Sequence, residues 1–94
     1  MYELIIPNSV EKDIKRLPQS VQKLLGEEYL PLIQRGPKEG KFLHGQFHNL
    51  RAFKLSDKGV EYRIVYQVIE KPENVVLIRI GARENFYDRL LRRI

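Results

Sequence analysis

The chain has 94 residues, which is enough for one domain with one core (residues 1–94) and too few for two. It contains no Cys, so a disulfide framework, a thiolate metal site and a Cys nucleophile are excluded. The first residues lack a signal-peptide pattern, and no segment approaches the ~20 apolar residues of a membrane span, so we expect a cytoplasmic protein without a membrane partner. The net charge of +5 favours a polyanionic partner such as nucleic acid, although this bias alone is weak.

The chain begins with a predicted strand and a predicted helix. Residues 2–6 are a short β-prone run that ends at Pro7. Asn8, with Glu11 three residues later, has the form of a capping box that opens a helix, and Pro18 ends it.

A second helix follows directly, because Pro18 also suits the first helical position. Its apolar period continues to the Gly-Pro stop at residues 36–37, so the two helices should form a hairpin. Pro31 removes a backbone donor inside the second helix, which predicts a kink or an early end near Tyr29.

The second half of the chain is predominantly β. After a polar segment interpreted as a loop, residues 37–49, come three β-type runs at residues 50–55, 60–69 and 75–80. Their short connections favour an antiparallel meander, which the N-terminal strand should join at an edge. The expected fold class is therefore α+β, with a strand and helical hairpin packed on an antiparallel sheet of about four strands.

The chain closes with a short basic helix at residues 84–94, on which Phe86, Leu90 and Leu91 can dock and the arginines stay mostly exposed.

Strand alternation assigns each side chain of the meander to one face of the sheet. The predicted core set is Phe53, Leu55, Tyr62, Ile64, Tyr66, Val68, Val76, Ile78 and Ile80. The opposite face then collects four cations, which are Lys54, Arg63, Arg79 and Arg83. A charged outer face is an ordinary way to solvate a sheet, but a cluster of like charges also suggests an anionic ligand.

Symmetric loops would set the register of this cationic face. A five-residue loop at residues 70–74 pairs Ile69 with Val75 and places Arg63 opposite Gly81. A four-residue loop at residues 56–59 places Ala52 opposite Arg63, with Lys54 diagonal to it. The small residues Ala52 and Gly81 would leave room for a ligand in this groove.

Few other residues carry a chemical signal. Tyr87 follows the last strand closely enough to hold its phenol over the groove, or else it docks as an ordinary helix aromatic. His44 and His48 lie on the loop without a suitable third ligand, so we expect exposed histidines, no metal site and no cofactor.

Three segments resemble the RelE/ParE superfamily of type II toxin–antitoxin toxins: Leu43-His44-Gly45, GVEYRIVYQV at residues 59–68 and IGARENFY at residues 80–87. The resemblance spans nearly the whole chain and implies a RelE-like fold. RelE-type members are metal-independent endoribonucleases that cut messenger RNA in the ribosomal A site, whereas ParE-type members poison DNA gyrase and generally lack the basic catalytic set.

The resemblance also implies site residues. The family's phosphate-contacting arginine falls on Arg63, the arginine after the last strand on Arg83, a groove lysine on Lys54 and the C-terminal tyrosine on Tyr87. A second groove lysine of RelE is replaced here by Ala52. Glu61 projects from the face of Arg63 and is a rival general base, with neutralisation of Lys54 or Arg83 as its plainer role.

The leading hypothesis is thus a ribosome-dependent ribonuclease toxin that inhibits translation. Its expected partners are the ribosome, messenger RNA and a cognate antitoxin, the last in a hetero-oligomeric complex. Additional RNA contacts are expected from Arg79, Arg89, Arg92 and Arg93. The alternatives are a ParE-like gyrase inhibitor without catalytic activity and a basic RNA-binding module.

Overall fold

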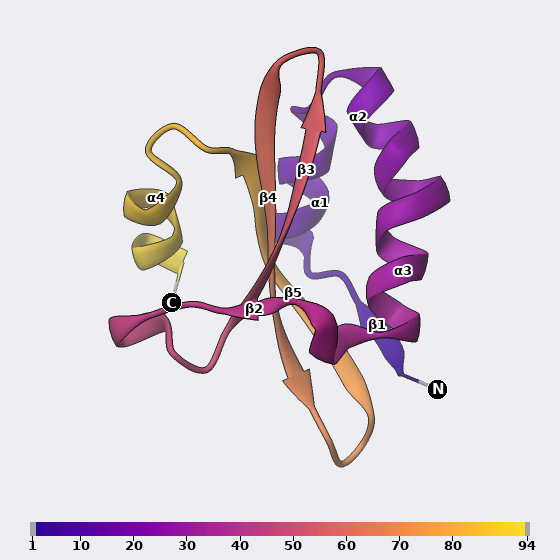
Figure 1. Cartoon of the computed structure of the whole chain (residues 1–94), viewed down its shortest axis with the longest axis vertical. Helices are drawn as coiled ribbons and strands as arrows, with labels where there is room; N and C mark the ends of the chain where they lie inside the picture. The colour runs from indigo at the N-terminus through magenta and orange to yellow at the C-terminus, as the bar shows by residue number, and fades with distance from the viewer. Residues whose placement is uncertain (1, 94) are drawn as a thin grey trace.

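Five strands form one mixed sheet in the order β1-β5-β4-β3-β2, in a computed structural model that describes residues 2–93 (Figure 1). The strands are β1 (Glu3–Ile5), β2 (Lys41–Phe42), β3 (Arg51–Asp57), β4 (Val60–Ile69) and β5 (Asn74–Ala82). β1 lies parallel to β5 at one edge, and the other neighbours are antiparallel. The predicted α+β class, the meander and the edge position of the first strand are confirmed. The additional strand β2 lies in the segment that was expected to be a loop.

Helices cover both faces of this sheet (Figure 1). On one face lie α1 (Asn8–Lys15), α2 (Gln19–Leu24) and α3 (Leu30–Arg35), with a π-helical turn at Leu25–Tyr29 between the last two. On the other face lies α4 (Phe86–Arg93). Two 3₁₀ turns, Pro37–Glu39 and Gly45–Phe47, lie in the segment between α3 and β3. The expected last helix was to end at Ile94, which lies, with Met1, outside the described residues.

Helix α1 begins without the expected capping box. Its N-cap is Pro7, whose carbonyl accepts hydrogen bonds from the backbone N–H groups of Val10 and Glu11, and no side chain caps the helix. Asn8 is therefore already helical. The prediction was wrong because the extended backbone of Pro7 (φ −65°, ψ 161°) itself starts the helix one residue earlier.

The second helix, expected to kink or end near Tyr29, does not end there but continues to Arg35, with its α-helical pattern interrupted by the π turn that ends at Tyr29. The N–H of Leu30 donates to the carbonyl of Leu25, five residues back, which is π-helical hydrogen bonding. This turn places Pro31 in the first turn of α3, where a helix residue needs no backbone donor. The π turn thus accommodates the proline that was expected to break the helix.

The β3–β4 hairpin is tighter than predicted. Lys58 and Gly59 have φ of 51° and 81° and connect Asp57 to Val60 as a two-residue turn. The register therefore moves relative to the expected four-residue loop. Lys54 lies directly opposite Arg63, whereas Ala52 lies opposite Val65.

A bulge changes the alternation of β5. Arg63 pairs with Gly81 as predicted, but Ile69 pairs with Asn74 rather than Val75. The register shifts by one residue between two neighbouring pairs, Val65 with Arg79 and Tyr66 with Leu77. Ile78 therefore has no partner on β4 and forms the bulge.

The core assignment of β5 was consequently wrong at two positions. Val75 and Leu77 are fully buried on the helix-hairpin side, where Val76 and Ile78 had been expected. Ile80, beyond the bulge, lies in that core as predicted.

Two apolar clusters hold the layers together. The larger lies between the sheet and α1–α3 and contains Tyr62, Ile64 and Tyr66 of β4. The smaller lies on the opposite face, where α4 and the 43–50 segment cover β4, and consists of Phe47, Leu50, Val65, Phe86 and Leu90. Part of the face expected to be open is therefore covered. Leu91 was also expected to dock, but it is 49% exposed, so this part of the prediction was wrong.

None of the helices formed by residues 2–93 is long and apolar enough to span a bilayer.

Candidate RNA-binding groove

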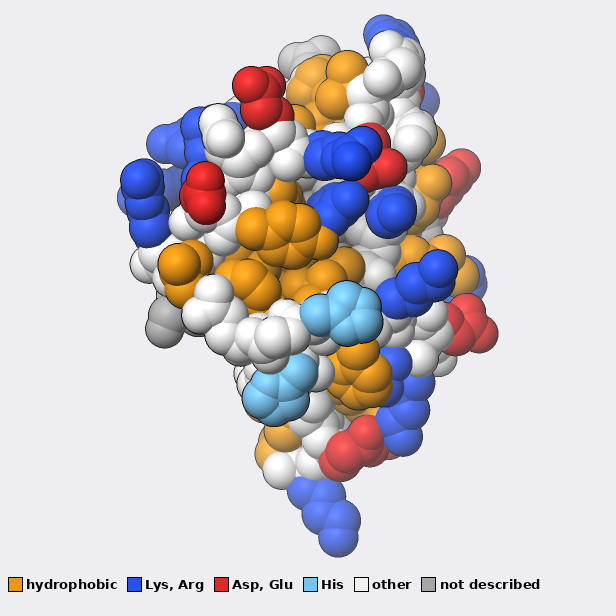
Figure 2. All heavy atoms as spheres, turned by 60° about the vertical axis from the view of Figure 1, so that its left-hand side comes forward, with side chains coloured by type: hydrophobic (Ala, Val, Ile, Leu, Met, Phe, Trp, Pro, Cys, Tyr) orange, Lys and Arg blue, Asp and Glu red, His pale blue; other side chains and the backbone are white. Residues whose placement is uncertain are grey.

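The groove lies on the face of the sheet that carries α4. It encloses about 410 Å³, and its walls come from β3, β4, the start of α4 and residues 39–44. Lys54, Arg63 and Tyr87 line it, together with Ala52 and Phe53. Figure 2 shows Lys and Arg side chains gathered beside apolar surface on this side of the molecule, with histidine nearby. The groove thus combines positive charge with aromatic surface.

Arg63 is held from several sides. Its Nε and Nη2 donate to Oε2 of Glu61 at 3.3 and 3.2 Å, and its Nη1 donates to the Tyr87 hydroxyl. The guanidinium carbon lies 5.2 Å from the centre of the Tyr87 ring, and the side chain is 13% exposed. Arg63 therefore has one defined position on the groove wall. Glu61 neutralises Arg63, and not Lys54 or Arg83 as considered from the sequence.

Tyr87 stands at the start of α4, over the groove as predicted. Its ring packs on Phe47 with centroids 6.1 Å apart and meets Phe86 edge-on at 5.7 Å. The turn before α4 places Asn85 at φ 55°, in the left-handed region. Because Phe86 is buried and Tyr87 is 41% exposed, the helix is anchored by one ring and presents the other.

Lys54 contributes a cation without a partner. It is exposed, lies opposite Arg63 in the β3–β4 register and lines the groove. Within residues 2–93, no carboxylate forms an ion pair with its ammonium. Lys54 is therefore free to engage an anion in the groove.

Arg83 lies just beyond the groove. Its backbone N–H donates to the carbonyl of Glu61 at 3.0 Å, which continues the β4–β5 pairing, while its side chain is exposed. Arg83 is not among the residues that line the groove. Arg89 and Arg92, on α4, are exposed and line a different hollow.

Arg79 does not join the groove, contrary to the prediction. Its side chain is 5% exposed, and its guanidinium lies 4.2 Å from the ring centre of Phe86. A Cβ on Gly81 would lie 2.8 Å from Nη2 of Arg79, so this arginine fills the space expected for a ligand. Burial lowers the pKa of Arg79. Arg79 lies on the predicted face of the sheet, opposite Val65, but α4 packs over this part of the face and buries it against Phe86.

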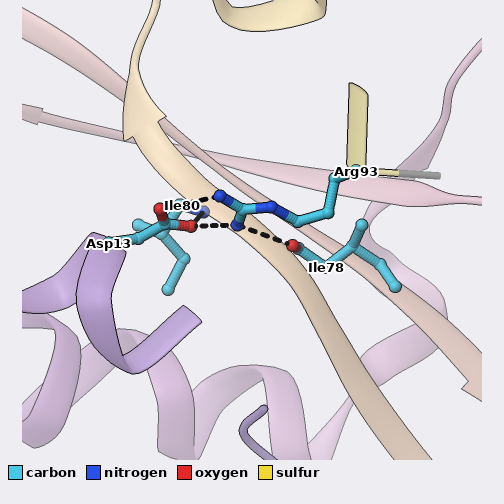
Figure 3. A network of polar contacts seen from close by, with 4 residues as sticks. All are labelled: Asp13, Ile78, Ile80 and Arg93. Carbon is cyan, nitrogen blue, oxygen red and sulfur yellow. Dashed lines mark hydrogen bonds and ion pairs between the residues drawn. The ribbon is translucent and has the colours of Figure 1, made fainter. Parts of the chain in front are cut away.

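Arg93 is also engaged within the protein rather than freely exposed (Figure 3). Its Nη1 donates to Oδ2 of Asp13 at 2.6 Å and to the carbonyl of Ile78 at 3.1 Å. The same carboxylate oxygen accepts from the N–H of Ile80 at 3.1 Å. Asp13 is 7% exposed, so its carboxylate is buried together with these partners.

The apolar wall formed by Phe42 and Leu43 was missed from the sequence, since a two-residue strand inside a polar segment has no detectable period. His44 and His48 are exposed, as expected, and His44 lines the groove. No group of three or more His, Asp or Glu residues within residues 2–93 is placed to hold a metal ion.

Comparisons with known proteins agree with this architecture. The free RelE toxin of E. coli, solved as a double arginine-to-alanine mutant, is 28% identical, with 99% of this chain and 97% of that chain covered and a TM-score of 0.77. The toxin chain of the E. coli RelBE complex is 27% identical, with 89% and 99% covered and a TM-score of 0.72. The RelBE2 complex of Mycobacterium tuberculosis matches at 22% identity, 87% and 98% coverage and a TM-score of 0.72, which shows a shared fold.

No individual curated protein matches the chain by sequence. A family profile does, over residues 4–91, and it describes the ParE-like toxins of type II bacterial toxin–antitoxin systems. The match spans nearly the whole chain, and the structural relatives are RelE toxins. The chain therefore belongs to the ParE-like toxin family of type II toxin–antitoxin systems, with RelE as its structural counterpart.

Proposed function

We propose that this toxin is a ribosome-dependent endoribonuclease that cleaves messenger RNA and so inhibits translation in the cytoplasm. The observation that carries the proposal is the groove in which Arg63 is fixed by Glu61 and Tyr87 beside the unpaired Lys54. A protein-binding poison has no need for cations that converge on one hollow. Phosphate cleavage does need them.

The reaction requires three tasks, none of which needs a metal ion. The 2′-hydroxyl must lose its proton, the pentavalent phosphorane must be stabilised, and the departing 5′-oxygen must gain a proton. Arg63 suits the second task because its guanidinium is permanently charged and can bind two phosphate oxygens at once.

We assign both proton transfers to Lys54, which accepts the proton of the 2′-hydroxyl and returns it to the departing 5′-oxygen, since Oε2 of Glu61 already accepts from Arg63. Glu61 then acts as a positioning residue that holds the guanidinium. Arg83, exposed just beyond the groove, would assist the leaving oxygen by charge, and the Tyr87 ring would stack on a base.

The cognate antitoxin is the proposed protein partner. Two of the related structures are complexes named RelBE and RelBE2, in which a toxin is bound to its antitoxin. An acidic or amphipathic segment laid across the groove would bury Arg63 and compete with RNA for the same charges. The resulting complex would be hetero-oligomeric and would lose affinity with salt.

Gyrase inhibition is the second candidate, because the matching profile is that of ParE-like toxins. In that case the groove would be a protein contact surface, and no residue in it would affect RNA.

The deciding experiment is primer extension on a message translated in the presence of the purified toxin. Arg63→Ala removes the phosphate contact from the transition state, so single-turnover cleavage should fall at least ~10²-fold, about 2.7 kcal/mol, with much less change in ribosome binding. Arg35→Ala, an exposed arginine of α3 outside the groove, is the matched control and should cleave at the parental rate. Parental cleavage by Arg63→Ala would contradict the proposal.

A further inference from the structure

A second hollow lies apart from the groove. It encloses about 460 Å³ between α1, β5 and α4, and it is lined by Asp13, Arg16, Arg79, Arg89, Arg92 and Arg93. None of these residues lines the groove that contains Arg63. The Phe86 ring contacts one lining residue of each hollow, Arg79 of the second hollow and Tyr87 of the groove.

The charge of this hollow is strongly unbalanced. Five guanidinium groups surround one carboxylate, that of Asp13. Both oxygens of that carboxylate already accept hydrogen bonds from Arg93, and one also accepts from the N–H of Ile80. Guanidinium groups do not lose their protons in proteins, so the positive charge of the other four arginines cannot be relieved by titration.

Arg79 provides a second observation that points to a ligand. Its Nη1 is buried and has no hydrogen-bond partner among residues 2–93. An unpaired buried donor on a charged group is costly, and native structures rarely keep one without a ligand, ion or water to satisfy it. Burial is the main cause of the lowered pKa of Arg79, and the nearby charges of Arg89 and Arg93 act in the same direction.

We propose that this hollow is a phosphate-binding site, separate from the catalytic groove, in which Arg79, Arg89 and Arg16 hold the phosphate oxygens. A phosphate group fits better than a carboxylate because its oxygens can accept from several guanidinium forks at once. The phosphate is either free in solution or part of an RNA backbone. Because Arg79 belongs to β5, Arg89 to α4 and Arg16 directly follows α1, the bound phosphate fastens α4 to the rest of the fold.

Inorganic phosphate is the probe for the first test, titrated at constant ionic strength against chloride. Calorimetry should show saturable binding at one site, and the Tm should rise by at least about 4 °C at saturation. Arg89→Gln should weaken phosphate binding at least ~10-fold, since the neutral amide cannot replace the charged fork. Arg35→Gln removes the same charge from exposed α3, away from this hollow, and should bind phosphate as the parent does.

Arg79→Met gives a second, independent readout. Without phosphate this variant should melt at or above the parental Tm, because it removes a buried charge with an unpaired donor. With phosphate the order should reverse, since only the parent gains stability. If phosphate raises the Tm of Arg89→Gln and Arg79→Met as much as that of the parent, the effect is a general salt effect and the site is disproved.

The source of the phosphate is decided with a short single-stranded RNA and the Arg63→Ala protein, whose catalytic groove is impaired. Displacement of phosphate by RNA in this protein, abolished by Arg89→Gln, assigns the site to the RNA backbone. Phosphate binding without displacement by RNA assigns it to free phosphate. Both measurements are binding assays, so their outcome does not depend on whether the protein cleaves RNA.

Discussion

Arg63 occupies a fixed position because Glu61 and Tyr87 hold its guanidinium from two directions. A long side chain loses conformational freedom when it binds a ligand, and that cost falls when the protein has already fixed it. The same contacts leave Glu61 poorly placed to accept a substrate proton. Lys54 lines the groove and faces Arg63 across the β3–β4 strand pair. Unlike Arg63, it forms no ion pair with a carboxylate of residues 2–93.

The roles of Lys54 and Glu61 can be separated by substitution. Lys54→Ala should lower single-turnover cleavage at least ~10²-fold and remove the rise in rate with pH that deprotonation of a general base produces. Glu61→Gln keeps the shape of the side chain, so it should lower the rate less, about 3–10-fold, through looser positioning of Arg63 and leave the rise with pH in place. A pH–rate profile of both variants checks this. The reverse pattern would assign the base to Glu61.

Gly40 is a position where one methyl group should matter. A Cβ there would lie 2.0 Å from the hydroxyl oxygen of Tyr66, which donates to the carbonyl of Pro37 at 2.7 Å. Burial raises the pKa of Tyr66 to about 12, so the hydroxyl keeps its proton and its donor role at physiological pH. Gly40→Ala must displace this fully buried ring, and we expect the free energy of unfolding to fall by about 2–4 kcal/mol in urea denaturation.

Gly26 provides the matched control, because a Cβ at this helical position meets nothing within 4 Å. Gly26→Ala should raise the free energy of unfolding by about 0.5–1 kcal/mol through helix propensity. A loss of stability in both variants would show that the two glycines are needed for backbone conformation rather than for space.

At the scale of the elements, the open edge of β5 explains why α4 is fastened where it is. β1 pairs only with Asn74 to Val76, so beyond that point the strands of residues 2–93 leave this side of β5 unpaired, while its other side pairs with β4. Asp13 accepts from the N–H of Ile80 there, and Arg93 donates to the carbonyl of Ile78 (Figure 3). Two side chains from different helices thus cover an edge that could otherwise pair with another chain.

Removal of either side chain should therefore loosen the C-terminal helix. Asp13→Ala leaves the N–H of Ile80 without its acceptor, and Arg93→Ala leaves a buried carboxylate without its ion pair. Each should lower the free energy of unfolding by about 2–3 kcal/mol. The double variant should lose less than the sum, with a coupling energy of about 1–3 kcal/mol in a urea double-mutant cycle. Strict additivity of the two losses in free energy would mean that Asp13 and Arg93 do not stabilise the fold through their contact with each other.

The same elements show how far the sequence predicts this fold. Helices and long strands were recovered because apolar period and proline positions are local signals. Arg63 was placed correctly because alternation holds along β4, and Tyr87 because it closely follows the last strand. The positive φ of Lys58, a residue type seldom found there, concealed the tight turn that brings Lys54 opposite Arg63. Arg79 lies on the face that alternation predicts, but its burial under Phe86 depends on the packing of α4, which no local pattern records.

At the scale of the molecule, positive charge is divided between two hollows that share no lining residue. A net charge of +5 on so small a protein favours fast, salt-sensitive association with a polyanion such as the ribosome. Of these two hollows within residues 2–93, the groove is the one that combines its charges with exposed aromatic rings, those of Phe42 and Tyr87. The proposed function therefore predicts that binding to a large RNA surface and reaction at one phosphate can be separated by substitution.

Expression in growing bacteria without an antitoxin tests the proposed function as a whole. Growth should stop, and pulse labelling should show an immediate fall in protein synthesis while DNA synthesis initially continues, because messages are cut before replication is affected. Arg63→Ala expressed to the same level should permit growth, since it retains the fold but lacks the phosphate contact. Early DNA damage with intact messages, unchanged by Arg63→Ala, would instead identify the toxin as a gyrase poison and leave the basic groove as a surface for protein contact.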